Sequence, residues 1–421
     1  MKEQKNLEFK ESVTNTFLKT VSAFANYGTG RIKFGIRDNG DIVGISDPEK
    51  TCLDIENRIN DSINPVPQYT LSINEKNSVI TLEVEEGLNK PYLYKSKAYR
   101  RNDTATIEVD RLDLTRLILE GQSSSFEELP SKMEDLHFTD LEKKLKSVLH
   151  LETFSKDTLK TLELLDNRDN INIAGELLAD KNSFSGTDIV RFGDSISIML
   201  DREIHEHESV LLQYDEAVNM YRKYYQYDEI KSITRETVSL IPEDAFREAV
   251  ANALVHRAWD ISSDIKIGMY PEKIEIISPG GLPKGVTEEE YLRGGISVLR
   301  NRILGNIFFR LNLIERFGTG IRRINEAYHD SEKKPVFDIS ENSIRISLPV
   351  VNTDNIPNTL TEDENKIYRL LKGYSMASSE IAERAAFGKT KTVKILKKLV
   401  EDGYVRSNGN GRGRKYSVDL Y

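Results

Sequence analysis

The 421-residue chain contains one cysteine, Cys52, and one tryptophan, and it has no long run of apolar residues. A single cysteine excludes a disulfide bond within the chain and any zinc site built on several thiolates. No apolar run approaches the ~18 residues of a membrane-spanning helix. The first six residues, MKEQKN, also lack the apolar segment of a signal peptide. These absences predict a cytoplasmic protein that makes no membrane contact.

The chain also lacks a net positive charge. It has 59 Lys and Arg residues and 68 Asp and Glu residues, which gives a net charge of −9. Any affinity for a nucleic acid must therefore come from a local basic surface. The length suits about two to four domains, each with its own core. Polar stretches between the patterned segments predict an α/β multidomain protein with units at residues 1–121, 132–240, 241–350 and 360–421.

A helix predicted over residues 244–259 is the central feature of the third unit, because its apolar residues recur at helical spacing. Glu248, Asn252 and His256 follow one another at intervals of four and therefore form a polar ridge on one face of this helix. A carboxylate, an amide and an imidazole in this order can hold a water molecule, a metal ion and a phosphate oxygen. A solvated helix face is the alternative interpretation.

Two glycine-rich turns follow, SPGGLP at 278–283 and FGTGI at 317–321. Together with the ridge they resemble the GHKL (Bergerat-fold) ATP-binding domain, an α/β sandwich, in the divergent form found in bacterial transcriptional regulators. The resemblance implies that Glu248 polarises the attacking water and that Asn252 holds Mg²⁺. It implies that ATP is bound by Glu248, Asn252, His256, Gly280, Gly281, Gly318, Thr319 and Gly320. Pro279 stands where the family carries the aspartate that reads adenine, so adenine specificity and hydrolysis stay open.

The first unit is predicted to be a compact α/β domain, with helices at 13–26, 49–63 and 110–119 and strands at 32–36, 42–45, 69–73 and 79–84. Four motifs in it resemble the Schlafen AlbA-type domain: LEFKES at 7–12, AFAN at 23–26, GIRDNG at 35–40 and YRRNDT at 99–104. The resemblance covers about 120 residues and implies a nucleic-acid-binding domain.

In the nuclease members of that family, two glutamates five positions apart and a later aspartate bind the catalytic metal. The matching positions here are Glu3, Glu8 and Asp38, with Lys10 beside them. Oxygen ligands of this kind suit Mg²⁺ or Mn²⁺, which would activate water against a phosphodiester. A separation of five places Glu3 and Glu8 on opposite sides of a regular strand, so a bend is required. The alternative is a binding domain whose acids are surface charges.

The second unit is predicted to mix short helices and strands, including a helix at 204–226 with His205 and His207 on it. A metal site is one interpretation of this His-Glu-His sequence. Solvated side chains are the other, because residues two apart on a helix point in different directions. In the third unit, strands are predicted at 264–269, 273–277 and 343–350.

The fourth unit is predicted to be a winged helix-turn-helix, with helices at 361–371, 378–385 and 389–402 and a hairpin around a turn at 407–414. From residue 389 onward, nine Lys and Arg residues oppose three Asp and Glu residues. The third helix and the hairpin can therefore contact the phosphates of duplex DNA. The predicted contacts are Lys389, Lys391, Lys394, Lys398, Arg406, Arg412, Arg414 and Lys415. Protein docking is the alternative use of such a domain.

Two functions agree with these patterns. The first is a nucleotide-responsive, DNA-binding transcriptional regulator. The second is a Schlafen-like, metal-dependent endoribonuclease that cleaves RNA or tRNA as a stress or antiphage defence effector. Catalysis, as an RNA endonuclease or a weak ATPase, is left open. The regulator is favoured because the winged helix is predicted from the residues alone. A homodimer is expected, since palindromic DNA sites and a two-lobed nuclease clamp both require two copies.

Overall fold

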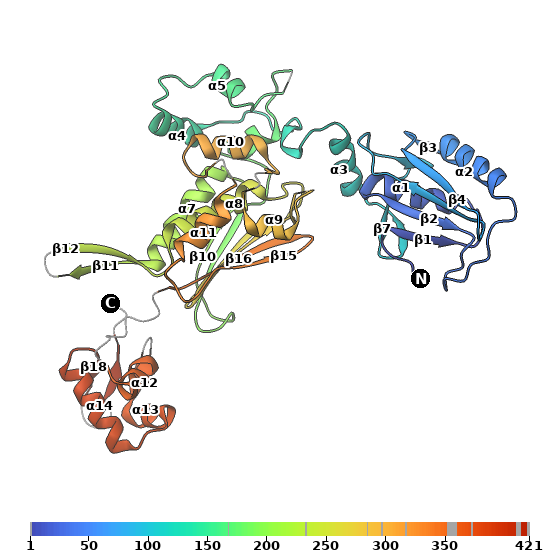
Figure 1. Cartoon of the computed structure of the whole chain (residues 1–421). Coiled ribbons are helices and arrows are strands. Elements are labelled where there is room, and N and C mark those ends of the chain that lie inside the picture. The colour runs from blue at the N-terminus through green and yellow to red at the C-terminus, as the bar shows by residue number, and fades with distance from the viewer. Residues whose placement is uncertain are drawn as a thin grey trace.

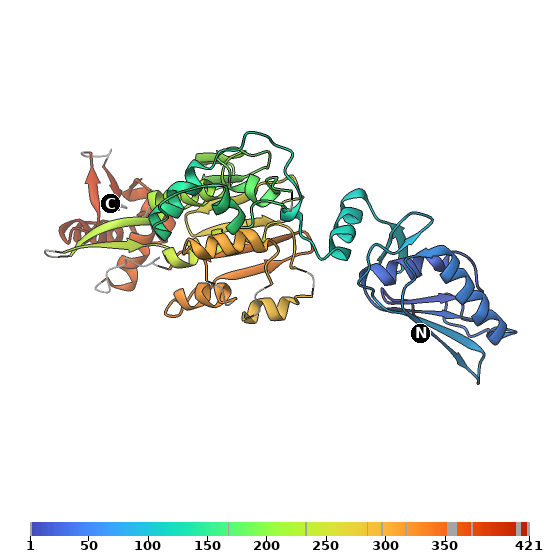
Figure 2. The ribbon, with the colours of Figure 1, turned by 90° about the horizontal axis from the view of Figure 1, so that it is seen from above.

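The computed structural model describes residues 2–166, 168–231, 234–283, 285–295, 298–315, 318–351, 360–371, 374–409 and 414–418. These residues form three groups of helices and strands (Figures 1 and 2). The prediction of a mixed α/β multidomain protein is confirmed. No helix within the described ranges combines the length and the apolar character that crossing a bilayer requires.

The N-terminal group is built on a four-stranded sheet of order β1-β2-β5-β4, in which only β1 and β2 run parallel. Its strands are β1 (Leu7–Lys10), β2 (Gly30–Phe34), β4 (Tyr69–Asn74) and β5 (Val79–Val84). Short pairs are formed by β3 (Ile63–Asn64) with β6 (Leu93–Tyr94), and by β7 (Tyr99–Asn102) with β8 (Ala105–Glu108). The helices are α1 (Phe17–Tyr27), α2 (Pro48–Ser62) and α3 (Arg111–Gly121). The apolar side of α1 packs on the sheet, with Phe17 and Phe34 in edge-to-face contact at 5.4 Å.

Two predictions for this group need correction. The strand expected at 42–45 is a loop that makes only a single bridge, between Ile36 and Ile42. The chain turns instead at Gly44, whose φ is +69°, and the N–H groups of Val43 and Gly44 both donate to the carbonyl oxygen of Gly35, at 2.9 and 3.0 Å. The first helix begins at Phe17, four residues later than expected from residue 13.

The central group contains one six-stranded sheet of order β10-β9-β13-β14-β16-β15. The strands are β9 (Thr187–Phe192), β10 (Met199–His205), β13 (Ile265–Tyr270), β14 (Lys273–Pro279), β15 (Val336–Ile339) and β16 (Ser343–Pro349). The helices are α4 (Thr139–Leu149), α5 (Lys156–Thr161), α6 (Ile173–Leu178), α7 (Val210–Tyr225), α8 (Glu243–His256), α9 (Glu288–Arg293), α10 (Arg302–Arg310) and α11 (Gly320–Ala327). A hairpin of β11 (Gln226–Lys231) and β12 (Thr234–Ser239) projects from this group (Figure 1).

The boundary expected at residue 240 falls inside this sheet. β9 and β10 come from the predicted second unit, and β9 pairs in parallel with β13 of the predicted third unit. One hydrophobic core extends from Phe138 to Val350 and includes side chains from both segments. Strands that lie so far apart in the chain leave no local sequence pattern when they pair. The prediction therefore divided one core between two units.

The helix predicted at 204–226 is wrong in its first six residues. Met199–His205 is strand β10, and α7 begins at Val210 with the Ser209 side chain accepting a hydrogen bond from the N–H of Leu211. His205 contacts two carboxylates, with Nδ1 at 2.8 Å from Glu208 and Nε2 at 3.4 Å from Glu203. In the described part of the chain, no group of three or more His, Cys, Asp and Glu side chains is arranged to hold a metal ion.

The C-terminal group has helices where they were predicted: α12 (Glu362–Leu371), α13 (Ser378–Ala385) and α14 (Lys389–Glu401). A small sheet of order β17-β19-β18 lies beside them, formed by β17 (Met376–Ala377), β18 (Arg406–Asn408) and β19 (Lys415–Ser417). The start of α12 is capped, because the N–H of Thr361, the residue before the helix, donates to Glu364 Oε2 at 2.8 Å.

Side-chain contacts join the groups. Arg116 of α3 forms a bidentate pair with Asp260, which follows α8, at 2.6 and 3.1 Å. Tyr374 donates its hydroxyl to Asp194 in the β9–β10 turn at 2.5 Å. Between α3 and the central group, the fully buried Glu127 accepts hydrogen bonds from the N–H groups of Ile303 (2.6 Å) and Leu304 (3.1 Å), at the start of α10. Burial raises the pKa of this carboxyl to about 7.

We expect Glu127→Gln to remove a pH dependence of stability. A pKa raised from 4.5 to about 7 on folding gives stability that is complete below pH 4.5 and is lost as pH rises through 7. Between these limits the wild type should lose about 3 kcal/mol more unfolding free energy than the variant. Urea unfolding followed by the fluorescence of Trp259, the chain's single tryptophan, at pH 5 and pH 8 measures this difference. Parallel pH profiles for the two proteins would contradict it.

Candidate functional site

The polar ridge of α8 lines a small cavity. Its lining includes Glu248, Asn252 and His256 of α8 together with Gly318 and Gly320 at the start of α11, and apolar residues such as Leu299 and Ile321. Asn252 donates from Nδ2 to Glu248 Oε1 at 3.2 Å. A Cβ atom on Gly320 would lie 2.5 Å from Glu248 Oε1 and 2.7 Å from Asn252 Nδ2, so only glycine permits this close approach of α11. The structure therefore brings together the ridge and two of the predicted glycines.

Burial controls the charge of this cavity. It raises the pKa of the Glu248 carboxyl above its ordinary value, which favours the protonated form relative to an exposed glutamate. Burial, and then the nearby Arg300 guanidinium, lower the pKa of His256 to about 4. At neutral pH the ridge thus presents an uncharged imidazole at one end and, about two helical turns away, a carboxyl group that is protonated more readily than usual.

The other predicted nucleotide contacts, Gly280, Gly281 and Thr319, lie outside the described lining of this cavity. A Cβ on Gly280, whose φ is +99°, would lie 2.7 Å from the Cβ of Ala258, and one on Gly281 would lie 2.4 Å from the carbonyl oxygen of Glu341. Both glycines hold the SPGGLP turn against the end of α8 and the segment before β16. Thr319 is the residue before α11. Among the described residues, these three are not part of the cavity wall.

Three side chains that the sequence did not single out for this role close the carboxyl end of α8. Asn301 donates from Nδ2 to the carbonyl oxygens of Val255 (2.7 Å) and Arg257 (2.8 Å). Arg300 donates to the carbonyl oxygens of His256 (3.0 Å) and Gly281 (2.6 Å), and the Ser278 hydroxyl donates to that of Ala253 (2.8 Å). The sequence could not indicate this role, because Arg300 and Asn301 lie 44 to 46 positions after the carbonyl groups that they reach at the end of α8.

The cavity contains two oxygen-bearing side chains of α8 but little free volume. The Glu248 carboxylate and the Asn252 amide oxygen are ligands that Mg²⁺ accepts. The cavity volume, however, is about 70 Å³, whereas pockets for organic ligands measure roughly 300–1,000 Å³. A nucleotide therefore does not fit in this conformation. The segment after α9 narrows the space, since Gly295 donates to the carbonyl oxygen of Gly318 at 2.9 Å and Arg322 donates to those of Arg293 and Gly294, both at 3.2 Å.

The N-terminal carboxylates are not gathered at one point. Glu8 is almost fully buried, and its oxygens contact the Thr20 hydroxyl (2.6 Å), Lys10 Nζ (2.6 Å) and Arg101 Nη1 (2.7 Å). Glu3 accepts a hydrogen bond from the N–H of Phe9 at 2.8 Å. Asp38 is exposed in the turn after β2. Lys10 thus forms an ion pair with one of the carboxylates that it was predicted to accompany.

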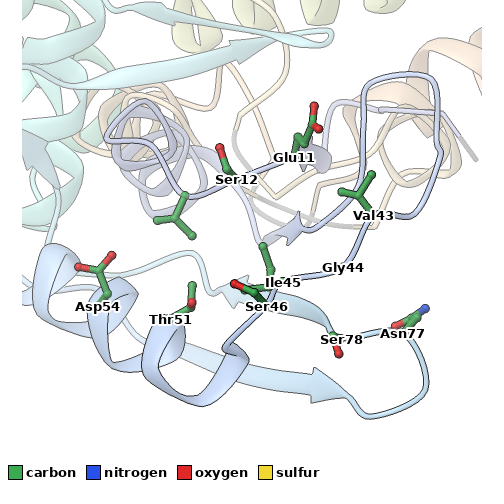
Figure 3. Close-up of a pocket in the computed structure, with 11 residues that line it drawn as sticks. Glu11, Ser12, Val43, Gly44, Ile45, Ser46, Thr51, Asp54, Asn77 and Ser78 are labelled. Carbon is green, nitrogen blue, oxygen red and sulfur yellow. The ribbon is translucent and has the colours of Figure 1, made fainter.

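A cavity of about 740 Å³ lies elsewhere in the N-terminal group, between the end of β1, the 43–46 segment, α2 and the β4–β5 turn. Figure 3 shows Glu11 and Ser12 on one side of it and Thr51 and Asp54 of α2 on the other. Its described lining does not include Glu3, Glu8 or Asp38. The predicted catalytic residues therefore lie outside the described lining of this cavity.

The basic residues of the C-terminal group divide into two sets. Lys391 and Lys398 form ion pairs with Asp363 and Glu364 of α12, both at 2.7 Å, and thereby fix α14 against α12. The Lys398 side chain, together with the N–H of Thr361, lowers the pKa of Glu364 to about 2. The second set consists of Lys389, Lys394, Arg406, Arg414 and Lys415, and the residues of both sets are exposed to solvent. Arg412 lies outside the described residues.

Two family models match the chain. "Schlafen, AlbA_2" covers residues 3–110, and "Putative ATP-dependent DNA helicase recG C-terminal" covers residues 262–348. The domain composition predicted from the motifs is thereby confirmed. The second match begins after α8, so Glu248, Asn252 and His256 lie outside it. No curated protein matches the chain.

Two solved structures are similar to it. The DIP2311 protein from Corynebacterium diphtheriae is 18% identical, with 98% of this chain and 92% of that chain covered and a TM-score of 0.47. The N-terminal domain of a "Putative ATP-dependent DNA Helicase RecG-related Protein" from Nitrosomonas europaea is 25% identical, with 25% of this chain and 80% of that chain covered and a TM-score of 0.19. Both TM-scores are too low for the arrangement of elements to be transferred.

We expect Asn301→Ala to destabilise the central group by about 3 kcal/mol, because it leaves two buried carbonyl groups without their donor. Asn325→Ala is the matched control, since Asn325 is exposed on α11 and its loss should change stability by less than about 0.5 kcal/mol. Urea unfolding followed by Trp259 fluorescence compares the two variants. Equal unfolding midpoints would show that Asn301 does not hold the end of α8.

Proposed function

We propose that the chain, which combines a Schlafen AlbA_2 domain with a domain of the recG C-terminal type, is a DNA-binding regulator that responds to a nucleotide. In this proposal the C-terminal group is a winged helix that binds duplex DNA. The central group takes the nucleotide at the cavity beside α8. The observation that carries the proposal is the exposed basic side of α14, next to the basic β18–β19 pair.

The orientation of α14 supports a role in DNA binding. Thr392, Leu396 and Leu399 of this helix are buried against the rest of the group. Lys394 and Lys397 are exposed on the side away from this core. A helix held in this way can place its outer side in the major groove, which is about 12 Å wide. The ion pairs of Lys391 and Lys398 with α12 stiffen the support beneath it.

The β18–β19 pair extends the same basic surface. Arg406 on β18 and Arg414 and Lys415 at the start of β19 are exposed. In a winged helix such a hairpin lies beside the groove that receives the helix and contacts the phosphate backbone. Contacts to phosphates supply affinity that falls steeply with salt. A chain of net charge −9 can bind DNA by this local surface alone.

The ribonuclease alternative requires a change at Glu8. A metal ion there would have to displace the contacts from Thr20, Lys10 and Arg101. A carboxylate that already binds two cationic groups and a hydroxyl has little remaining capacity for a metal ion. DNA binding needs no such rearrangement of the C-terminal group and is therefore the function that the geometry supports best.

Lys394→Ala/Lys397→Ala should weaken binding to duplex DNA of any sequence. The slope of log K against log salt should fall by about one for each lysine that contacts a phosphate. Fluorescence anisotropy with a labelled duplex at several salt concentrations measures both quantities. Lys333→Ala is the control, because Lys333 is an exposed lysine of the central group. Unchanged affinity and slope in the double variant would remove α14 as the DNA-binding element.

Arg322→Ala should increase the affinity for ATP by about fivefold, because it removes contacts that hold the segment after α9 over the cavity. Isothermal titration calorimetry with Mg²⁺ and a non-hydrolysable ATP analogue measures the affinity directly. Arg310→Ala is the matched control, since Arg310 is exposed on α10. A wild type and an Arg322 variant that both fail to bind the analogue would refute nucleotide binding at this cavity.

A further inference from the structure

The β9–β10 hairpin exposes an unusual number of apolar side chains. The exposed fractions are 72% for Ile196, 49% for Ile198, 61% for Met199, 59% for Leu200 and 50% for Ile204. We call these five residues the hairpin surface. Single exposed apolar residues are common, but several of them on one hairpin indicate a binding surface.

The hairpin surface continues onto the sheet. Met199 lies opposite Phe192 in the β9–β10 register, and the Phe192 ring stacks on that of Tyr270 with centroids 5.0 Å apart. At the turn, a Cβ on Gly193 would lie 3.0 Å from Ile198 Cγ2 and 3.8 Å from Leu200 Cδ1. These two side chains therefore share one side of the hairpin, and together with the rings they form one apolar area.

This area is on the side of the sheet that the helices leave open. Along β13, Ile265, Ile267 and Met269 are buried, whereas Lys266 and Tyr270 between and after them are not. The buried set belongs to the core shared with α7, α8 and α11, which lie on one side of the sheet (Figure 1). Phe192 and Tyr270 thus lie on the opposite side, which no helix of the described ranges covers.

Two charged residues of β10, Asp201 and Arg202, are paired within the chain. Arg202 forms a bidentate pair with Asp188, with both distances 2.9 Å. Asp201 accepts from Lys223 of α7 at 2.9 Å. Because these charges are neutralised within the chain, the hairpin surface offers apolar contact rather than an attraction for phosphate. The strand also lies at the end of the sheet order, where its outer edge pairs with no described strand.

We propose that the hairpin surface binds the same surface of a second copy of the chain. Such a contact is self-complementary about a two-fold axis, which is the usual arrangement in homodimers. The Asp194–Tyr374 hydrogen bond attaches the C-terminal group to the turn of this hairpin. A dimer formed here therefore places both C-terminal groups near the axis, as recognition of two DNA half-sites requires. The choice of a second copy over another protein rests on the DNA-binding function proposed above.

Sedimentation velocity of the full chain without DNA tests the proposal over a hundredfold concentration range. The wild type should sediment at twice the chain mass of 48.0 kDa, and Leu200→Lys/Ile204→Lys should sediment at the single chain mass. A second variant, Ile196→Lys/Ile198→Lys, removes the other end of the surface and should have the same effect. The control is Val336→Lys, because Val336 is 60% exposed on β15 at the opposite edge of the sheet. It should remain dimeric.

A monomeric wild type, or two double variants that stay dimeric with unchanged Trp259 fluorescence, would overturn the proposal. DNA binding is measured separately on a duplex with one half-site and on one with two. If the wild type is a dimer that the hairpin variants dissociate but binds neither duplex, the dimer surface stands and the DNA-binding function fails. Variants that keep the affinity for one half-site but lose the additional affinity that a second half-site gives the wild type would support both the dimer surface and the DNA-binding function.

Discussion

A helix that ends inside a protein leaves carbonyl groups that only other protein groups can reach. The carboxyl end of α8 is in this position, since Val255, Arg257, Ala258 and Trp259 are buried. The amide of Asn301, the guanidinium of Arg300 and the hydroxyl of Ser278 supply the missing donors. These donors fix the position of His256 and therefore of the whole polar ridge. The cavity beside α8 exists because this end of the helix is held.

The same requirement links the cavity to the segment that follows α3. Arg300 and Asn301 lie directly before α10, and the start of α10 is capped in turn by Glu127. Arg116 of α3 reaches Asp260, which follows the end of α8. The segment that leaves the N-terminal group is thus bound at two points to the residues that hold the ridge. A displacement of α3 acts on α8 through hydrogen bonds, without a contact between the N-terminal sheet and the cavity.

Local patterns of the sequence were sufficient where structure depends on near neighbours. The i, i+4 spacing of Glu248, Asn252 and His256 correctly placed all three on one wall of a cavity. Alternation of apolar residues correctly located β13, β14 and β16. The pattern failed at 199–205, which is an edge strand with three charged residues and a histidine. The prediction assigned the end of this strand to the following helix. An edge strand buries neither side fully, so its alternation is weak.

Contacts between distant residues could not be predicted. Glu127 and Ile303 are 176 positions apart, and nothing near either residue indicates the other. Gly280 and Gly281 were predicted to contact a nucleotide because glycines permit close approach. The close approach is present, but the groups that approach are Ala258 and Glu341. The glycines indicated that another group comes close to the backbone at these positions. The sequence did not indicate which group that is.

The link between Arg116 and Asp260 has a practical consequence for work in solution. Both side chains are partly open to water, and the electrostatic range in water shrinks from about 10 Å at 0.1 M salt to about 3 Å at 1 M. Raising the ionic strength therefore weakens the attachment of the N-terminal group at the same time as it weakens any contact with phosphates. A salt titration of the full chain reports two effects at once, a change of molecular shape and the release of a ligand. Light scattering is needed to separate the two effects.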